Sequence, residues 1–250
     1  MKSVQHVDWQ SWIDRYDRMQ EKYLVRRSER FEIIAGLIKS VCPNPKLMID
    51  LGCGTGSLTV RLLEEFDSVK IYAVDLDPAV LLLAENRLKS FSSRVEIIQS
   101  DITKMNWDKY IGADAVVSAT ALHWLIPENL ETIYGKIHKI LRNGGIFLNA
   151  DHAGSPNNIV QHRWELNREQ MRVQEKTQSA DDWDEFWQQF LTELGQTARI
   201  EREKALGQWQ GTEEGMPLQW HFQKLEHCGF EYIDCFWRCD CDIVYGAIKK

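Results

Sequence analysis

Two histidines that follow predicted strands are the residues of this sequence best suited to proton transfer. His123 and His152 are candidate general bases, because histidine titrates near neutral pH and both lie just beyond a strand end. The alternative role for each is to orient a ligand through a hydrogen bond. Asp151 and His162 lie near His152 in the sequence, but their spacing is not diagnostic of a metal site, and we predict no bound metal.

A glycine-rich loop indicates a second kind of chemistry, the binding of a nucleotide-sized cofactor. Gly52, Gly54 and Gly56 belong to the stretch LMIDLGCGTGSLT, an apolar run that leads into an amphipathic pattern. Glycines allow a sharp turn and a close approach of ligand to backbone, and a strand–loop–helix unit of this kind is a common cofactor site. Ser57 stands where a dinucleotide fingerprint needs glycine, and no P-loop lysine follows. Asp50 before the loop suits a cationic or hydroxylated ligand better than a pyrophosphate.

Aspartates at the ends of the next two predicted strands are placed to hold a nucleoside. Asp75 lies about 20 residues beyond the glycine loop, where a carboxylate can accept hydrogen bonds from both hydroxyls of a ribose. Asp77 precedes Pro78 and is interpreted mainly as a helix N-cap. Asp101 could accept a hydrogen bond from an adenine amino group while Ile102 packs on the ring. The alternative for Asp101 is a turn or another N-cap.

These residues are positioned by an alternation of strands and helices. We predict strands at 47–51, 70–75, 94–99, 113–118 and 145–150, with helices at 58–66, 78–90 and 130–141 between them. A helix at 218–228 and an antiparallel pair of strands at 231–237 and 243–248 complete the pattern. Such alternation indicates an α/β fold with a parallel sheet and helices on both faces, in which ligands bind beyond the carboxyl ends of the strands.

Two segments lie outside this alternation. We expect N-terminal helices covering the cofactor site at 1–45, a binding core at 46–152 and 218–250, and a helical cap inserted at 153–217. Within the cap, helices are predicted at 158–177 and 180–194, whereas 195–216 is expected to be irregular. Because the insertion leaves the sheet at its ligand end, we expect it to build the substrate pocket and exclude water. The alternative is that it covers apolar surface and does nothing more.

Aromatic residues from both segments are candidates for the walls of that pocket. The predicted pocket residues are Tyr16, Tyr23, Trp124, Trp164, Trp187 and Trp237, with Trp183 and Trp209 as further candidates. Tyr16 and Tyr23 share an aromatic helix face, and Arg26 or Arg27 could close with them over a ligand. Aromatic walls suit a planar or cationic substrate, and the alternative is that these rings pack against the domain.

The block DLGCGTG and the aspartates after the second and third strands resemble motif I and the following cofactor positions of the class I S-adenosylmethionine (SAM) dependent methyltransferases. The sequences LHW after the fourth strand and DH after the fifth resemble the small-molecule branch, which includes enzymes related to trans-aconitate methyltransferase. The resemblance covers about 46–152 and 218–250. It implies a Rossmann-like, doubly wound sheet of seven strands, mostly parallel with an antiparallel last hairpin.

The resemblance also implies SAM as cofactor and S-adenosylhomocysteine (SAH) as product. Carried over to this sequence, the methionine part is held by Asp50, Gly52, Gly54 and Gly56, the ribose by Asp75, and the adenine by Asp101 and Ile102. Leu76 and Thr120 complete the predicted cofactor-binding residues. After the fourth strand the chain reads SATALH instead of the Asn/Asp-Pro-Pro-Tyr/Phe of many DNA- and amino-group-methylating relatives, which disfavours an adenine or glutamine acceptor.

We therefore predict a SAM-dependent methyltransferase that methylates an oxygen, nitrogen or carbon atom of a small molecule. Two alternatives stay open, a protein or tRNA methyltransferase and a non-catalytic SAM-binding protein. The net charge of −7 disfavours nucleic-acid or membrane partners. No apolar run reaches the roughly 18 residues of a membrane span, and the N-terminus lacks an apolar signal core. We expect a cytoplasmic protein that acts as a monomer or a homodimer.

The six cysteines contain no C-x-x-C pair, so reduced, structural thiols are expected rather than a zinc site or a disulfide. If the segment around residue 237 is a strand, the odd positions 235, 237, 239 and 241 share one of its faces.

Overall fold

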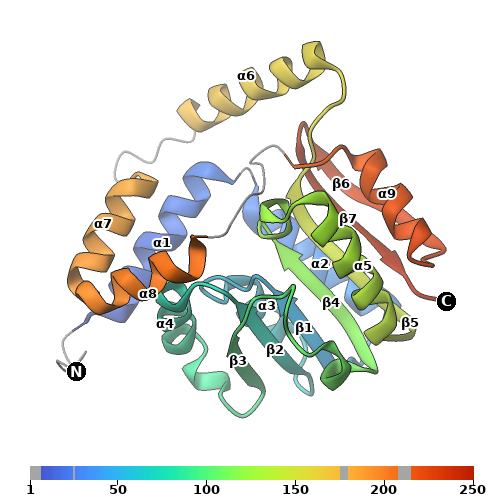
Figure 1. Ribbon diagram of the computed structural model, residues 1–250, viewed down its shortest axis with the longest axis horizontal. Coiled ribbons are helices and arrows are strands. Elements are labelled where there is room, and N and C mark those ends of the chain that lie inside the picture. The colour runs from blue at the N-terminus through green and yellow to red at the C-terminus, as the bar shows by residue number, and fades with distance from the viewer. Residues whose placement is uncertain (1–6, 25, 175–179, 208–214) are drawn as a thin grey trace.

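The computed structural model describes residues 7–24, 26–174, 180–207 and 215–250, whose strands form one sheet in the order β3-β2-β1-β4-β5-β7-β6 (Figure 1). The strands are β1 (Leu47–Leu51), β2 (Lys70–Asp75), β3 (Val95–Gln99), β4 (Ala113–Ala119), β5 (Leu141–His152), β6 (Tyr232–Cys239) and β7 (Asp242–Ile248). Strands β1 to β5 pair in parallel, whereas β7 runs antiparallel to both β5 and β6. The predicted Rossmann-like, doubly wound fold with an antiparallel last hairpin is confirmed.

Helices cover both faces of the sheet. One face is packed by α2 (Arg27–Val41), α3 (Ser57–Glu65) and α4 (Pro78–Arg87), and the other by α5 (Pro127–Ile140) and α9 (Leu218–His227). Short 3-10 turns are η1 (Lys89–Phe91), η2 (Trp107–Tyr110) and η3 (Leu122–Trp124). Because both faces are covered, the central strands are continuous apolar runs. Within the described residues, no helix is long and apolar enough to cross a membrane.

Helix α1 (Trp9–Tyr23) packs with the insertion rather than over the sheet. The insertion contains α6 (Asn158–Gln174), α7 (Trp183–Leu194) and α8 (Gln196–Leu206). An apolar cluster joins Trp12 and Tyr16 of α1 to Phe186 of α7 and Leu83 of α4. Figure 1 shows α1, α7 and α8 together on one side of the molecule, with α6 extending from α7 toward the β6–β7 hairpin. The two helices of the predicted N-terminal unit therefore have different positions, because α1 packs with the insertion and α2 packs on the sheet.

Ion pairs fasten the insertion to the rim of the sheet. Arg15 of α1 binds Asp181, just before α7, with 2.8 Å between Nε and Oδ2. Arg202 of α8 binds Asp77 at 2.7 Å and lies 3.6 Å from the centroid of the Trp187 ring. Because Asp77 follows β2 by two residues, the insertion reaches the carboxyl edge of the sheet.

Three local predictions are wrong. The sequence predicts irregular structure at 195–216, but α8 forms within it; none of its residues is fully buried, so the apolar stripe that would reveal a helix is weak. The residues LRNGG at 141–145, with two glycines, predict a turn ahead of the fifth strand, but they belong to β5, where the β4–β5 register shifts. A bulge in β6 pairs Cys235 with Tyr245 but Trp237 with Val244, so these two side chains pack on opposite faces of the sheet.

The cysteines agree with their prediction. All six lie within the described residues and are free thiols.

Candidate active site

The glycine loop joins β1 to α3 at the carboxyl edge of the sheet. Gly52, Gly54 and Gly56 have φ angles of 68°, 56° and 76°, in the left-handed region that favours glycine. A Cβ on Gly52 would lie 2.2 Å from the Cβ of Ala121, so the loop packs tightly against the segment after β4. A Cβ on Gly54 would meet no atom of the described residues within 4 Å. The backbone at Gly54 therefore faces space that a ligand can occupy.

Asp50 presents a buried acceptor beside this loop. Its side chain receives a hydrogen bond from Thr59, whose Oγ1 lies 2.5 Å from Oδ2. The other oxygen, Oδ1, is buried and has no hydrogen-bond partner within the described part of the chain. Burial raises the pKa of Asp50 to about 7. Buried acceptors in proteins are normally paired, so Oδ1 fits a ligand that brings a donor or a positive charge.

Asp75 at the end of β2 is held by the backbone on both sides. The N–H of Gly54 donates to Oδ2 at 2.8 Å and that of Asp77 to Oδ1 at 2.9 Å. The backbone N–H of Leu76 also stabilises this carboxylate, which still has acceptor capacity for a ribose hydroxyl. Burial raises the pKa of Asp75 to about 6. Asp77 caps α4 by accepting from Ala79, which confirms its structural role.

Asp101 after β3 forms a turn. Its Oδ1 accepts from the backbone N–H of Thr103 at 2.9 Å and from its hydroxyl at 2.7 Å, and Oδ2 lies 2.9 Å from Nζ of Lys104. Burial opposes ionisation, but these donors hold the pKa of Asp101 below its usual range. The turn alternative is therefore present in the structure. Ile102 packs, partly buried, against the apolar cluster under α5.

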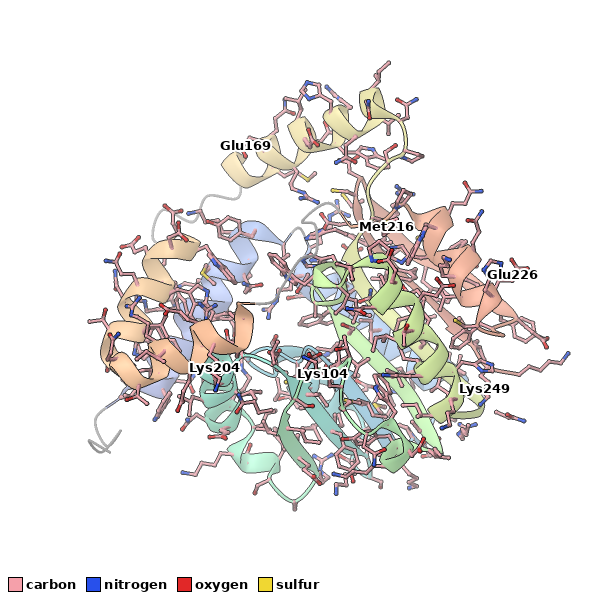
Figure 2. The ribbon with its side chains drawn as sticks, in the orientation of Figure 1. Lys104, Glu169, Lys204, Met216, Glu226 and Lys249 are labelled. Carbon is pink, nitrogen blue, oxygen red and sulfur yellow. The ribbon has the colours of Figure 1, made fainter. Side chains whose placement is uncertain are left out.

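A cleft of about 830 Å³ opens at this end of the site. Leu76, Asp101 and Trp124 line it from the sheet, and Lys204 lines it from α8. Figure 2 shows Lys104 at the sheet and Lys204 on α8, the two labelled lysines that border the cleft. The cleft lies beyond β2 and β3, where a doubly wound sheet places the base of a bound nucleoside.

Thr120 ends β4 in an unusual conformation. Its φ is 52°, and its N–H donates to the carbonyl of Ala150 at 2.8 Å. A non-glycine residue in this region is strained, and such strain concentrates at functional sites. The turn directs the chain into η3, so that Ala121 contacts Gly52 and His123 lies at the ends of β4 and β5.

His123 and Asp151 form a buried pair. Nδ1 of His123 lies 2.5 Å from Oδ1 of Asp151, and the His123 N–H donates to Oδ2 at 3.1 Å. Burial alone would raise the pKa of Asp151, but the imidazoles of His123 and His152 hold it well below its usual range. An ionised carboxylate can only accept, so Nδ1 of His123 carries the proton of this hydrogen bond, and Nε2 is the acceptor of the neutral ring. This is the arrangement of a histidine base oriented by a carboxylate.

A polar network behind Asp151 fixes its orientation. Asn149 donates to Oδ2 of Asp151 at 3.2 Å and to the hydroxyl of Tyr245 at 3.0 Å. That hydroxyl lies 2.6 Å from the hydroxyl of Tyr134, which in turn lies 2.7 Å from Nδ1 of His221. Burial lowers the pKa of His221 to about 4, so its ring is neutral. The Asn149 amide donates in both directions, so the network holds Asp151 in place rather than conducting protons.

His152 lies beside His123 but has different partners. The centroids of the two imidazoles are 5.2 Å apart. Nδ1 of His152 is 2.9 Å from Oδ1 of Asp242, and Nη1 of Arg30 approaches the same oxygen at 3.4 Å. Nη2 of Arg168, from α6, is 3.3 Å from Nδ1 of His152. The two candidate bases thus lie together. His123 is paired with Asp151, whereas His152 and its partner Asp242 are near the guanidinium groups of Arg30 and Arg168.

The predicted aromatic residues divide into two groups. Trp124 lies at the site, with its ring centroid 5.0 Å from that of His123. Tyr16 packs against Trp187, and both are less than one tenth exposed. Burial raises the pKa of the Tyr16 hydroxyl far above its usual value; Arg27 opposes this shift and Asp75 adds to it. The Tyr16 hydroxyl is therefore close to Asp75.

The other predicted pocket residues contact helices or loops of the chain. The Tyr23 hydroxyl accepts from the N–H of Trp183, and Trp164 packs under the guanidinium of Arg238. Trp237 donates from its indole to Glu29 of α2 at 3.1 Å, which agrees with its place in the bulged strand. Trp209 lies outside the described residues.

Charged residues that sequence reasoning left out of the predicted site are Arg30, Arg168 and Asp242. A signal existed for Arg30, because it precedes Ile34 by four residues and Ile38 by eight and so belongs to the buried face of α2. Arg27, one of two arginines considered, points inward and donates to the hydroxyl of Ser57 after the glycine loop. Among the described residues, no group of three or more His, Cys, Asp or Glu side chains is arranged to hold a metal ion.

The chain matches known proteins over the region that carries this geometry. Residues 48–145 match a family model described as a methyltransferase domain. Carboxy-S-adenosyl-L-methionine synthase of Campylobacter lari is 27% identical over 133 residues, 53% of this chain and 56% of the relative. Trans-aconitate 2-methyltransferase of Acidovorax ebreus is 29% identical over 143 residues, 57% of this chain and 51% of the relative. The chain thus aligns with about half the length of these curated relatives.

Solved structures share the architecture. Human N-acetylserotonin methyltransferase in complex with SAM superimposes with a TM-score of 0.57 at 17% sequence identity, covering 99% of this chain and 59% of that chain. At this level of identity the likeness establishes the fold.

Proposed function

The chain belongs to the class I SAM-dependent methyltransferases, and from this premise we propose that it transfers the methyl group of SAM to a small organic molecule. The observation that carries the proposal is the convergence of three features at one sheet edge. These are the open backbone at Gly54, the Oδ1 of Asp50 that has no partner among the described residues, and the buried Asp75 carboxylate at the end of β2.

Each of these groups matches one part of SAM. Oδ1 of Asp50 would accept from the ammonium of the methionine part at the glycine loop. Asp75 would bind the ribose hydroxyls, and Leu76 and Ile102 would contact the adenine. Asp101 accepts from the adenine amino group in place of its contact with Lys104, whose exposed ammonium is free to move. Thr120 borders the cofactor from the end of β4.

SAM, when bound, supplies an electrophilic methyl group on a sulfonium, so the protein mainly has to align the acceptor with it. His123 removes a proton if the acceptor is a hydroxyl or a ring carbon. Its Nε2 receives this proton while Asp151 stabilises the imidazolium that forms. His152 and Trp124 flank His123 and orient the acceptor. An acceptor that is already an amine or a carboxylate needs no base.

A small acceptor is supported by the enclosure of the site and by the charge of the chain. The insertion is tied to α1 and α4 by the Arg15–Asp181 and Arg202–Asp77 pairs, so it covers the ligand edge of the sheet. The net charge of −7 disfavours RNA. Trans-aconitate 2-methyltransferases, among the relatives, are named for a small-molecule acceptor.

The proposal is tested first by calorimetry with SAH. Asp75→Ala is expected to weaken binding about tenfold to hundredfold, because it removes two charge-assisted hydrogen bonds. Gly54→Arg is expected to abolish binding by filling the space over the loop. Asp67→Ala, at an exposed aspartate, is the matched control and is expected to bind as the parent does. Unchanged affinity in both site variants would refute a SAM site here.

Labelled SAM separates the remaining alternatives. Incubation with cell extract is expected to yield labelled small molecules. Label in protein or RNA instead would support the macromolecular alternative, and SAH binding without any labelled product would support a non-catalytic SAM-binding protein.

A further inference from the structure

Two arginines from distant segments meet beside His152. Arg30 comes from α2 under the sheet and is 1% exposed, whereas the half-buried Arg168 comes from α6 of the insertion. Both approach the ring of His152 or its carboxylate partner Asp242. Figure 1 shows how α6 extends above the sheet toward the hairpin that carries Asp242 at the start of β7. The insertion thus contributes a cation to the interior of the site.

Hydrogen-bond donors exceed acceptors in this corner. Nε of Arg30 and Nε of Arg168 are buried and have no partner among the described residues. Oδ1 of Asp242 is shared by Nη1 of Arg30 and Nδ1 of His152, and the shorter distance, 2.9 Å, belongs to the histidine. Since Nδ1 of His152 donates to Asp242, it cannot also accept from Nη2 of Arg168 at 3.3 Å, and this Nη2 donates to the sulfur of Cys241 instead. The two Nε donors are left without an acceptor among the described residues.

Two guanidinium groups meet in this corner, and Asp242 is the carboxylate in direct contact with Arg30. Burial lowers the pKa of Arg30; Asp242 and Asp151 oppose this shift, and the nearby charges of Arg27 and Arg168 add to it. A buried guanidinium without full compensation is costly. A carboxylate supplies acceptor oxygens in the bidentate geometry that guanidinium groups favour.

The position of the corner assigns its ligand to the acceptor side of the site. His152 is 5.2 Å from His123, ring centroid to ring centroid, and His123 is the proposed base. Arg27, by contrast, contacts Ser57 at the end of the glycine loop, on the side of the methionine part of SAM. The corner beside His152 thus adjoins the proposed base His123.

We propose that the methyl acceptor carries a carboxylate and that Arg30 and Arg168, beside His152, bind it. This specificity rests on the proposed function, since it names the class of molecule that is methylated. The arginine pair anchors the acceptor, and α6 of the insertion closes over it. The acidic chain thus has a local cationic site for an anionic substrate.

The test is calorimetry on protein saturated with SAH, using fumarate and benzoate as carboxylate probes and fumaramide and benzamide as their uncharged counterparts. The parent is expected to bind each acid about tenfold to hundredfold more tightly than its amide. Arg168→Gln and Arg30→Gln are expected to remove that preference. Arg163→Gln, at an exposed arginine on the same helix, is the matched control and is expected to keep it.

Two measurements keep the outcomes distinct. Circular dichroism verifies folding, and Arg30→Lys keeps the buried charge if Arg30→Gln does not fold. SAH affinity is measured separately for every variant.

Equal binding of acids and amides by the parent overturns the proposal, and so does an unchanged preference in Arg168→Gln. If SAH still binds in these cases, the proposed function is not affected. Weakened SAH binding with the preference intact overturns the proposal too, because the arginines would then hold the carboxylate of SAM. Absence of SAH binding by the parent refutes the proposed function itself.

Discussion

Lowering the pH from about 7 to about 6 is expected to weaken SAH binding about tenfold, because two buried carboxylates of the site become protonated in the free protein. Burial raises the pKa of Asp50 to about 7 and that of Asp75 to about 6. A raised aspartate pKa means that the neutral form dominates below that value. The ammonium and the ribose hydroxyls of SAH need ionised acceptors, so affinity falls as the pH falls.

The magnitude follows from the fraction of each group that is ionised. For Asp50 this fraction decreases from about one half at pH 7 to about one tenth at pH 6, a factor of about five. For Asp75 it decreases from about nine tenths to about one half, a factor of about two. The amino group of SAH stays largely protonated and its carboxyl group ionised in this window, so the protein accounts for the effect.

Titration calorimetry at the two pH values measures this step directly. Asp50→Asn removes the larger contribution, so its weaker SAH binding is expected to change only about twofold between pH 7 and pH 6. Asp67→Asn, at an exposed position, is expected to keep the full step. A parent affinity that is constant or increases as the pH falls would refute the reasoning, as would a full tenfold step in Asp50→Asn.

Two further predictions concern the glycine loop and the histidine–aspartate pair. Gly52→Ala is expected to lower the free energy of unfolding by about 1–3 kcal/mol, because its Cβ would lie 2.2 Å from that of Ala121 and its φ is 68°. Gly36→Ala, at an exposed helical site without a close neighbour, is expected to raise it by up to about 1 kcal/mol, and urea unfolding measures both. His123→Ala is expected to lower kcat about 10²–10⁴-fold with unchanged SAH affinity if the acceptor needs a base. Asp151→Asn is expected to lower kcat and shift the pH profile, and a profile identical to that of the parent would contradict its orienting role.

The cluster of aspartates at the carboxyl edge of the sheet could be predicted from the sequence because these residues follow strand ends. Asp50, Asp75 and Asp101 each occupy the last positions of a parallel strand or the loop after it, and a parallel sheet brings all such positions to one edge. The parallel topology therefore brings strand-end residues that are distant in the sequence together in space. The same logic placed His123 near His152, since β4 and β5 are neighbours.

The acceptor side could not be predicted in this way. Arg30, Arg168 and Asp242 come from a helix of the sheet layer, an inserted helix and an antiparallel strand, and 212 residues separate the first from the last. No periodic pattern encodes such a meeting. Trp237 illustrates a second limit, because one bulged residue moves every later side chain of β6 to the other face.

Within the described residues, the buried polar atoms of the site that lack a hydrogen-bond partner are an acceptor near the glycine loop and donors near His152. This difference indicates which ligand group binds at each end of the site. On the donor side the orphan is an acceptor, Oδ1 of Asp50, which favours the positively charged amino group of SAM. On the acceptor side the orphans are the Nε donors of Arg30 and Arg168, which favour an anion. An anionic acceptor held at one end and a cationic sulfonium held at the other attract each other across the site, which favours the approach that methyl transfer requires.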